Sequence, residues 1–128
     1  MHKMTAEWVR KAEADFRLAT MLARSKEPWH DQLCFHCQQS AEKYLKALLQ
    51  ELGQPVPRTH NLAALRTLLL SHYASLRSFR RGLEFLSRFA VGPRYPTYDA
   101  SKRQAASALR WAGRVRAECR GLLGLGSS

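Results

Sequence analysis

Acidic residues are scarce in this chain. It contains 10 Asp and Glu against 21 Lys and Arg among 128 residues, so its formal net charge is +11. The excess lies in residues 56–128, which carry 13 basic residues, 12 of them Arg, and only three acidic ones. A field of one sign attracts polyanions, and the Arg guanidinium binds phosphate in a forked geometry. The composition therefore favours contact with nucleic acid or a nucleotide. The alternative is a basic surface that is only solvated.

Long apolar runs are missing as well. None approaches the ~20 residues that a membrane span needs, and residues 1–8 lack the apolar core of a signal peptide. We therefore expect a cytoplasmic protein that does not enter the membrane. The length suits a single domain with a real hydrophobic core, which we place over residues 1–128 with its core at about residues 6–123.

Cysteine is rare, and its odd number excludes a complete disulfide framework. Cys34 and Cys37 form a lone CxxC pair with His36 between them, and Cys119 is the only other thiol. A structural zinc site needs about four ligands. We therefore interpret the three cysteines as small core residues and expect no metal and no other cofactor.

No segment has the alternating pattern and turn residues of β-strands, whereas apolar residues recur at spacings of three and four. The sequence predicts an all-α, up-and-down bundle of about five helices, three long and two short. We place them at about residues 5–25, 31–52, 61–72, 75–89 and 99–122, with a proline-containing linker at 54–60 and a loop at 91–98. The expected N-caps are Thr5, Asp31, Thr59 or Asn61, and Asp99.

The second predicted helix carries two lines of side chains. One is the expected apolar stripe, and the other consists of His36, Ser40, Lys43 and Ala47. His36 and Lys43 have two interpretations. In the first, His36 makes a structural hydrogen bond and Lys43 is a solvated lysine. In the second, both belong to a phosphate-binding line that faces a cleft. His60 likewise either bonds nearby backbone at a helix start or binds a ligand.

The loop in the basic half has the strongest functional pattern. Arg88, Arg94 and Tyr95 can present guanidinium groups and a stacking ring together, which suits a nucleotide. The alternative is that Arg94 bonds carbonyl groups at the end of the fourth helix while Tyr95 packs into the bundle. A nucleotidyl modification by a partner could fall on Tyr95 or Tyr98.

Three motifs together resemble the HEPN domain family (higher eukaryotes and prokaryotes nucleotide-binding). They are CFHCQQSAEKYLKALL at residues 34–49, PRTHNL at 57–62 and RYP at 94–96, and the resemblance extends over about residues 6–118. It implies a helical bundle that usually forms a homodimer and is often paired with a small nucleotidyltransferase as a toxin–antitoxin system. Many such domains are metal-independent ribonucleases with an Arg, four to six residues and then a His.

That nuclease motif is absent from the position where the family places it. Arg88 matches the motif Arg, but Arg94 stands where the His is expected; the pairs Arg24–His30 and Arg66–His72 have the right spacing elsewhere. Arg cannot act as a base near neutral pH, so His36 or His60 would have to replace the missing His. We therefore predict a nucleotide- or RNA-binding module of a two-component pair, and leave open whether it is an enzyme. One alternative is a metal-independent ribonuclease that uses Arg88 with a displaced base. The other is a structural partner protein with a basic docking face.

Overall fold

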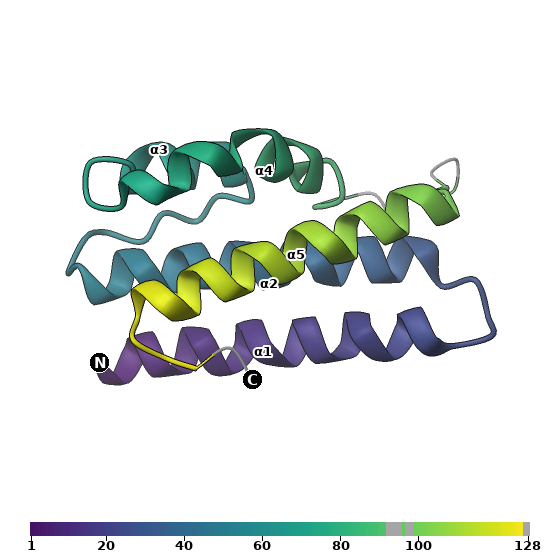
Figure 1. Cartoon of the computed structure of the whole chain (residues 1–128), viewed down its shortest axis with the longest axis horizontal. Coiled ribbons are helices and arrows are strands. Elements are labelled where there is room, and N and C mark those ends of the chain that lie inside the picture. The colour runs from purple at the N-terminus through teal and green to yellow at the C-terminus, as the bar shows by residue number, and fades with distance from the viewer. Residues whose placement is uncertain (92–95, 97–98, 127–128) are drawn as a thin grey trace.

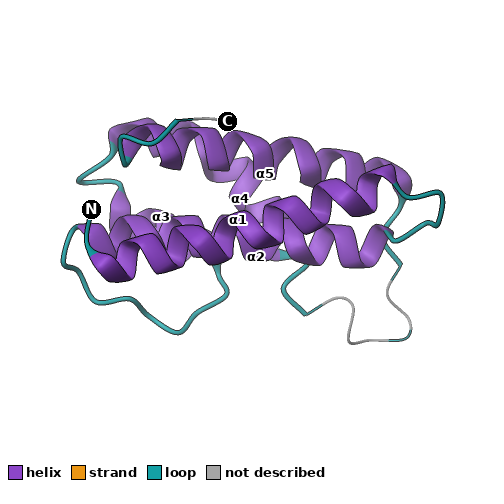
Figure 2. Ribbon diagram, turned by 90° about the horizontal axis from the view of Figure 1, so that it is seen from below, coloured by secondary structure: helices purple, strands orange, loops and turns teal. Residues whose placement is uncertain are grey.

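A computed structural model describes residues 1–91, 96 and 99–126 of the chain, and these residues form a helical bundle (Figures 1 and 2). The α-helices are α1 (Lys3–Arg24), α2 (His30–Glu51), α3 (Leu62–Leu69), α4 (Arg80–Ser87) and α5 (Lys102–Leu122), and a 3-10 helix, η1 (Ala74–Phe79), precedes α4. No strand occurs in the described ranges. The predicted all-α bundle of three long and two short helices is confirmed. None of the described helices is long and apolar enough to cross a membrane.

Helix α2 is the centre of the bundle. It packs against α1, α5, α3 and α4, and Figure 1 shows α1 on one side of it and the short helices α3 and α4 on the other. Its predicted apolar stripe is buried, including Cys34, Cys37, Leu45 and Leu48. A buried helix of this kind gains most of its stability from the apolar area that it removes from water.

The cysteines serve this packing. Cys34, Cys37 and Cys119 are free thiols in the core. Burial raises the pKa of Cys34 to about 12 and also raises the pKa of Cys37 and of Cys119. The thiolate is the form that acts as nucleophile or metal ligand, so these protonated thiols are unreactive. Within the described part of the chain, no three His, Cys, Asp or Glu residues are grouped to hold a metal ion.

Helix α4 is held close to α5 by a glycine. A Cβ atom on Gly82 would lie 2.1 Å from Cε3 of Trp111, a distance that no side chain could tolerate without a shift. The absence of a side chain therefore allows the two helices to approach.

Some predicted helix boundaries are wrong. At two of them, the start of the helix contacts a segment that is distant in the sequence. Helix α1 begins at Lys3, and Thr5 lies buried inside it instead of capping it. The chain start is tied to the end of α2, because the His2 backbone N–H donates to Glu51 Oε1 at 2.9 Å. Asp31 lies in the first turn of α2, where its carboxylate accepts from the Ala100 backbone N–H at 2.5 Å.

The remaining caps are local. Asn61 caps α3, as predicted, by accepting from the Ala64 N–H at 3.2 Å. Helix α5 is capped by Ser101 and not by Asp99, because Ser101 and Gln104 form a reciprocal capping box. The predicted fourth helix, 75–89, is split into η1 and α4, and α3 ends at Leu69, before His72.

Candidate functional site

A buried carboxylate on α2 organises the candidate site. Glu42 Oε2 accepts from Lys46 Nζ at 2.9 Å, and Glu42 Oε1 accepts from Gln38 Nε2 at 3.1 Å. These three residues are spaced four apart, so they follow one another along one face of the helix. Burial acts to raise the pKa of Glu42, but the hydrogen bonds from Lys46, His60 and Gln38 outweigh it, and the pKa is lowered. Glu42 is therefore a charged acceptor although its side chain is only 5% exposed.

His60 is the exposed member of this cluster. Its Nδ1 lies 2.8 Å from Glu42 Oε1, and its ring is 60% exposed. Its backbone carbonyl accepts from Gln38 Nε2 at 3.1 Å, which fixes the end of the linker onto α2. Because Glu42 is an acceptor, Nδ1 carries a proton, and the neutral ring then offers the Nε2 lone pair to solvent. The cluster thus orients an accessible imidazole.

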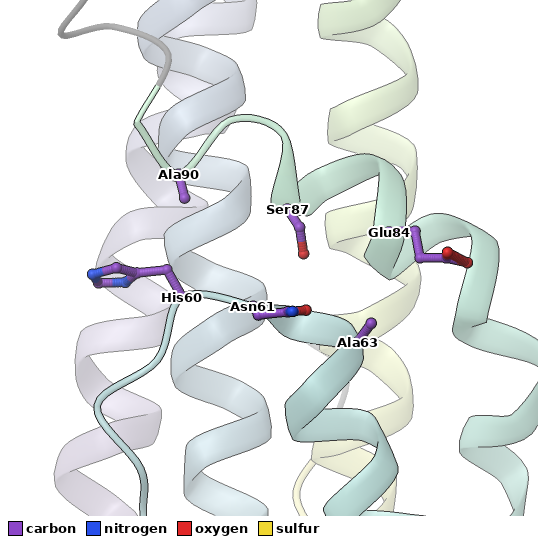
Figure 3. A pocket seen from close by; sticks show the side chains of 6 residues that line it. All are labelled: His60, Asn61, Ala63, Glu84, Ser87 and Ala90. Carbon is purple, nitrogen blue, oxygen red and sulfur yellow. The ribbon is translucent and has the colours of Figure 1, made fainter.

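A pocket of about 520 Å³ opens beside His60, between the start of α3 and the end of α4. Its lining residues are His60, Asn61, Ala63, Glu84, Ser87 and Ala90. Figure 3 shows His60 at one side of the pocket and Glu84 at the other, with Asn61, Ala63 and Ser87 between them. The volume lies within the range of small-ligand sites.

The pocket wall is built from the first turn of α3. Ser87 Oγ accepts from the Leu62 N–H at 3.0 Å and donates to the Leu83 carbonyl at 2.9 Å, which joins α3 to α4. Ala63 follows in the same turn of α3. The Leu62 and Ala64 N–H groups of this turn are already bonded to Ser87 and Asn61, so the helix dipole is what favours an anion here. Glu84 is the acidic element of the wall, and it pairs with Arg80 on the surface at 3.2 Å.

Arg88 directly follows Ser87 at the end of α4. It is exposed, and its guanidinium carbon lies 5.7 Å from the centre of the Phe85 ring. Among the described residues it has no ion pair, so its charge is not neutralised by a carboxylate. Arg94 and Tyr95, the other two residues predicted in this segment, lie outside the described residues, as does Tyr98.

His36 and Lys43 lie at a different place. Both bind Asp15 of α1: His36 Nδ1 is 2.9 Å from Oδ1, and Lys43 Nζ is 2.5 Å from Oδ2. Burial acts to raise the pKa of Asp15, but these two hydrogen bonds outweigh it and the pKa is lowered. The two side chains therefore join α1 to α2. His36 makes a structural hydrogen bond, whereas Lys43 is ion-paired with Asp15 and is not simply a solvated lysine. The structure thus pairs His36 with Lys43 and places His60 in the pocket lining, from which Arg88 is absent.

The two Arg–His pairs with nuclease spacing, Arg24–His30 and Arg66–His72, lie elsewhere in the bundle. Arg66 is buried and donates to the Leu76 carbonyl at 2.8 Å and the Arg77 carbonyl at 2.9 Å, which ties η1 to α3. Arg24 and His30 flank the turn between α1 and α2.

Sequence reasoning missed Glu42, Gln38 and Ser87. A signal for the first two was present, because Gln38, Glu42 and Lys46 form a polar line at helical spacing on a helix that is otherwise buried. A charged residue in such a position needs a partner. Ser87 left no such signal, since its role depends on a contact with Leu62, 25 residues away.

Comparison with known proteins agrees with this fold. The HEPN domain family model matches residues 5–122. The structure is similar to that of TT1696 from Thermus thermophilus, with 21% identity, a TM-score of 0.78, and coverage of 94% of this chain and 98% of that one. It is also similar to ST0689, an archaeal HEPN homologue, with 26% identity, a TM-score of 0.72, and coverage of 96% and 99%. No curated protein matched. The family match spans nearly the whole chain, and the protein therefore belongs to the HEPN domain family.

Proposed function

We propose that this domain binds single-stranded RNA or a nucleotide at the α3–α4 pocket, with His60 and Arg88 as phosphate-contacting groups. The observation that carries the proposal is the exposed His60 ring, held by the buried Glu42 carboxylate where α3 begins. A buried, fully hydrogen-bonded carboxylate that orients one exposed imidazole is more than helix packing needs. The exposed Arg88, which follows the pocket residue Ser87 in the chain, and the net positive charge of residues 56–128 support an anionic ligand.

The binding test uses a fluorescein-labelled single-stranded RNA of about 20 nucleotides and anisotropy at about 50 and about 200 mM salt. We expect His60→Ala and Arg88→Ala each to weaken binding by about tenfold, and affinity to fall steeply with salt. His72→Ala and Arg81→Ala are matched controls, because both residues are exposed and neither lines the pocket. Binding that is equally weakened by the controls would contradict the site.

Glu84 supplies a control of opposite sign. Its carboxylate lies on the pocket wall, where it opposes a phosphate. Glu84→Gln should therefore tighten RNA binding, whereas Glu27→Gln, at an exposed residue outside the pocket, should change affinity only slightly. Weaker binding by Glu84→Gln would mean that no phosphate enters the pocket.

A second candidate function, metal-independent ribonuclease, is favoured by the same His60–Glu42 pair. His60 Nε2 could take the proton of a 2′-hydroxyl, as the displaced base that the missing motif His requires. The 2′-oxygen would attack phosphorus, the bond to the 5′-oxygen would break, and this oxygen would leave with a proton taken from water. The products are a 2′,3′-cyclic phosphate and a 5′-hydroxyl, with Arg88 neutralising charge on the phosphate.

Incubation of the RNA with the protein in EDTA separates the two functions. A binding module leaves the RNA intact, whereas the ribonuclease yields cyclic-phosphate ends that disappear in His60→Gln and Arg88→Ala. Glu42→Gln keeps the size of the side chain but removes the negative charge that orients the ring, so it should slow cleavage more than it weakens binding.

We further propose a homodimer that pairs with a small nucleotidyltransferase in a toxin–antitoxin-like system. Membership of the HEPN domain family supports both parts. Sedimentation of the purified chain tests the dimer, and co-purification with a nucleotidyltransferase from the neighbouring reading frame tests the pairing. A monomer at micromolar concentration would contradict the first part, and a neighbouring frame that encodes no such enzyme would contradict the second.

A further inference from the structure

The outer face of α1 carries apolar side chains that the bundle does not use. Leu18 and Met21 are 38% and 63% exposed, and Met4 is 54% exposed. With Ala14, also exposed, they alternate at spacings of three and four over the helix, interrupted by Glu7 and Lys11. We call Met4, Ala14, Leu18 and Met21 the apolar seam. The opposite face of α1 packs on α2 through Val9, Ala12 and Ala19, so the seam is not needed for the fold.

A line of basic residues accompanies the seam. Lys3, Arg10, Arg17 and Arg24, the basic line, are spaced seven residues apart and are all exposed. In a straight helix, residues seven apart differ in direction around the axis by only ~20°. The four cations therefore follow one side of α1 at intervals of about 10.5 Å. Arg10 pairs with Glu7 on the surface at 3.0 Å. Arg17 and Arg24 form no ion pair within the described residues.

A hollow lies beside the basic line. It has a volume of about 360 Å³ and lies between α1 and α5. Its lining is mostly polar and consists of Glu13, Phe16, Arg17, Thr20, Met21, Arg24 and Arg116. The cation at its base is already neutralised, because Arg116 binds Glu13 at 2.5 Å and lies 5.2 Å from the Phe16 ring centre. The charges that face an incoming partner are therefore those of Arg17 and Arg24, on the rim. Figure 1 shows α1 at the edge of the bundle.

An apolar seam flanked by a line of one charge is the pattern of a helix that pairs with another helix. Flanking charges select the partner, because opposite charges attract across the seam and like charges repel. We propose that the outer face of α1 docks an acidic amphipathic helix of a different protein. Leu18 and Met21 would receive its apolar side chains, and Arg17 and Arg24 its carboxylates.

Charge disfavours a second copy of this chain as the occupant. In an antiparallel pair related by two-fold symmetry, the basic line of one α1 would face the basic line of the other. In a parallel pair it would face Trp8, Asp15 and Leu22, which are partly buried toward the bundle. Asp15 already binds His36 and Lys43 and has no free oxygen to offer. The seam also disfavours RNA, because a phosphate backbone would leave Leu18 and Met21 uncovered.

The test uses two labelled helical peptides of about 21 residues, three heptads long. Both have Leu at the seam positions, and the flanking positions are all Glu in one peptide and all Lys in the other, which keeps each peptide monomeric by self-repulsion. We expect the protein to bind the Glu peptide and not the Lys peptide. The double variant Arg17→Glu/Arg24→Glu should weaken the Glu peptide at least about tenfold and gain binding of the Lys peptide.

Two further variants separate a specific face from general attraction by a basic protein. Arg77→Glu/Arg81→Glu removes the same charge from exposed positions near α4 and should change the affinity for the Glu peptide less than about twofold. Leu18→Ser/Met21→Ser should weaken it at least about tenfold with an unchanged melting temperature, since both side chains are exposed.

Three results would overturn the proposal. The first is a Glu peptide that does not bind, or that is weakened as much by the α4 variant as by the α1 variant. The second is a protein dimer that Leu18→Ser/Met21→Ser dissociates, because the occupant would then be a second copy. The third is an RNA that displaces the Glu peptide and loses its own binding in Arg17→Glu/Arg24→Glu. Loss of RNA binding in His60→Ala or Arg88→Ala alone bears only on the α3–α4 pocket.

Discussion

Two clusters on α2 contain the same three kinds of side chain: a carboxylate, a lysine that binds it, and a histidine whose Nδ1 binds it. In the Asp15 cluster the histidine is His36, which lies on α2 itself and is 25% exposed where α1 meets α2. In the Glu42 cluster the histidine is His60, which comes from the linker before α3 and is 60% exposed. The backbone that supplies the histidine, and not the composition of the cluster, decides whether the ring can reach a ligand.

The lysines differ in the opposite sense. Lys46 is 7% exposed, whereas Lys43 is 23% exposed. In the Glu42 cluster the lysine is therefore buried and the histidine is exposed to solvent. In the Asp15 cluster both side chains are partly buried. This comparison suggests that the first cluster both stabilises the protein and presents a group, and that the second only joins two helices.

Removal of each carboxylate should have the largest effect. Glu42→Ala leaves Lys46 buried without its partner, so the free energy of unfolding should fall by about 3–5 kcal/mol. Asp15→Ala should cost less, about 1–3 kcal/mol, because His36 and Lys43 can turn to water. Urea denaturation followed by circular dichroism measures both, with Glu27→Ala as the exposed control. Equal losses for the two variants would contradict the difference in burial.

Acid should lower the free energy of unfolding through both clusters. The loss should be no larger than the loss caused by replacing the two carboxylates. The pKa of Glu42 is lowered from its usual 4.5 and that of Asp15 from its usual 3.8. The unfolded chain therefore binds more protons than the folded one as the pH falls through these usual values. The free energy of unfolding should accordingly be constant above about pH 5 and decrease below it. Glu42→Gln should reduce this decrease; an unchanged pH profile would mean that Glu42 is not ionised in the folded protein.

Replacement of the histidines should separate stability from binding. His36→Ala removes a partly buried hydrogen bond to a charged group, so it should cost about 1–2 kcal/mol and leave RNA affinity unchanged. His60→Ala should cost less than about 1 kcal/mol, because Lys46 and Gln38 still bind Glu42, and should act on RNA affinity. Chemical denaturation and anisotropy on the same samples provide both readings. The reverse assignment would place the ligand at the Asp15 cluster.

The smallest effect is expected at Ser40, between the two clusters on α2. Its hydroxyl is buried and finds no hydrogen-bond partner among the described residues. Ser40→Ala removes this unsatisfied group, so it should stabilise the protein by up to about 1 kcal/mol. Thermal melting measures the shift. A destabilised Ser40→Ala would indicate that the hydroxyl has a partner, and would make Ser40 a candidate ligand group again.

Much of the fold could be predicted from local patterns. The stripe from Cys34 to Leu48 is buried because apolar residues at a period near 3.6 must all face one side of a helix. The Asn61 cap could be predicted for a similar reason, since an Asn before a helix can bond the N–H group three residues ahead. Ser101 and Gln104 carry the same kind of signal, and they outcompete Asp99 because their two side chains satisfy each other's backbone N–H groups.

Other features depend on contacts between distant segments. The sequence predicts Asp31 as the cap of α2, but the Ala100 N–H, 69 residues away, is the group that it binds. Glu42 could have been suspected as a charge in a buried stripe, but its link to His60 crosses a linker with two prolines. The spacing of His36 and Lys43 predicts that they share a face of α2. It does not predict whether a ligand or Asp15 binds there.

The sequence by itself determined the helical class, the family and the presence of an unusual polar line on α2. These properties follow from spacing along the chain, because helix geometry converts spacing directly into a face. Only the tertiary structure decided that His60 stands beside a pocket while His36 is held by α1. That decision depends on which carboxylate each ring meets, and Asp15 and Glu42 reach their histidines only after the other helices have packed against α2.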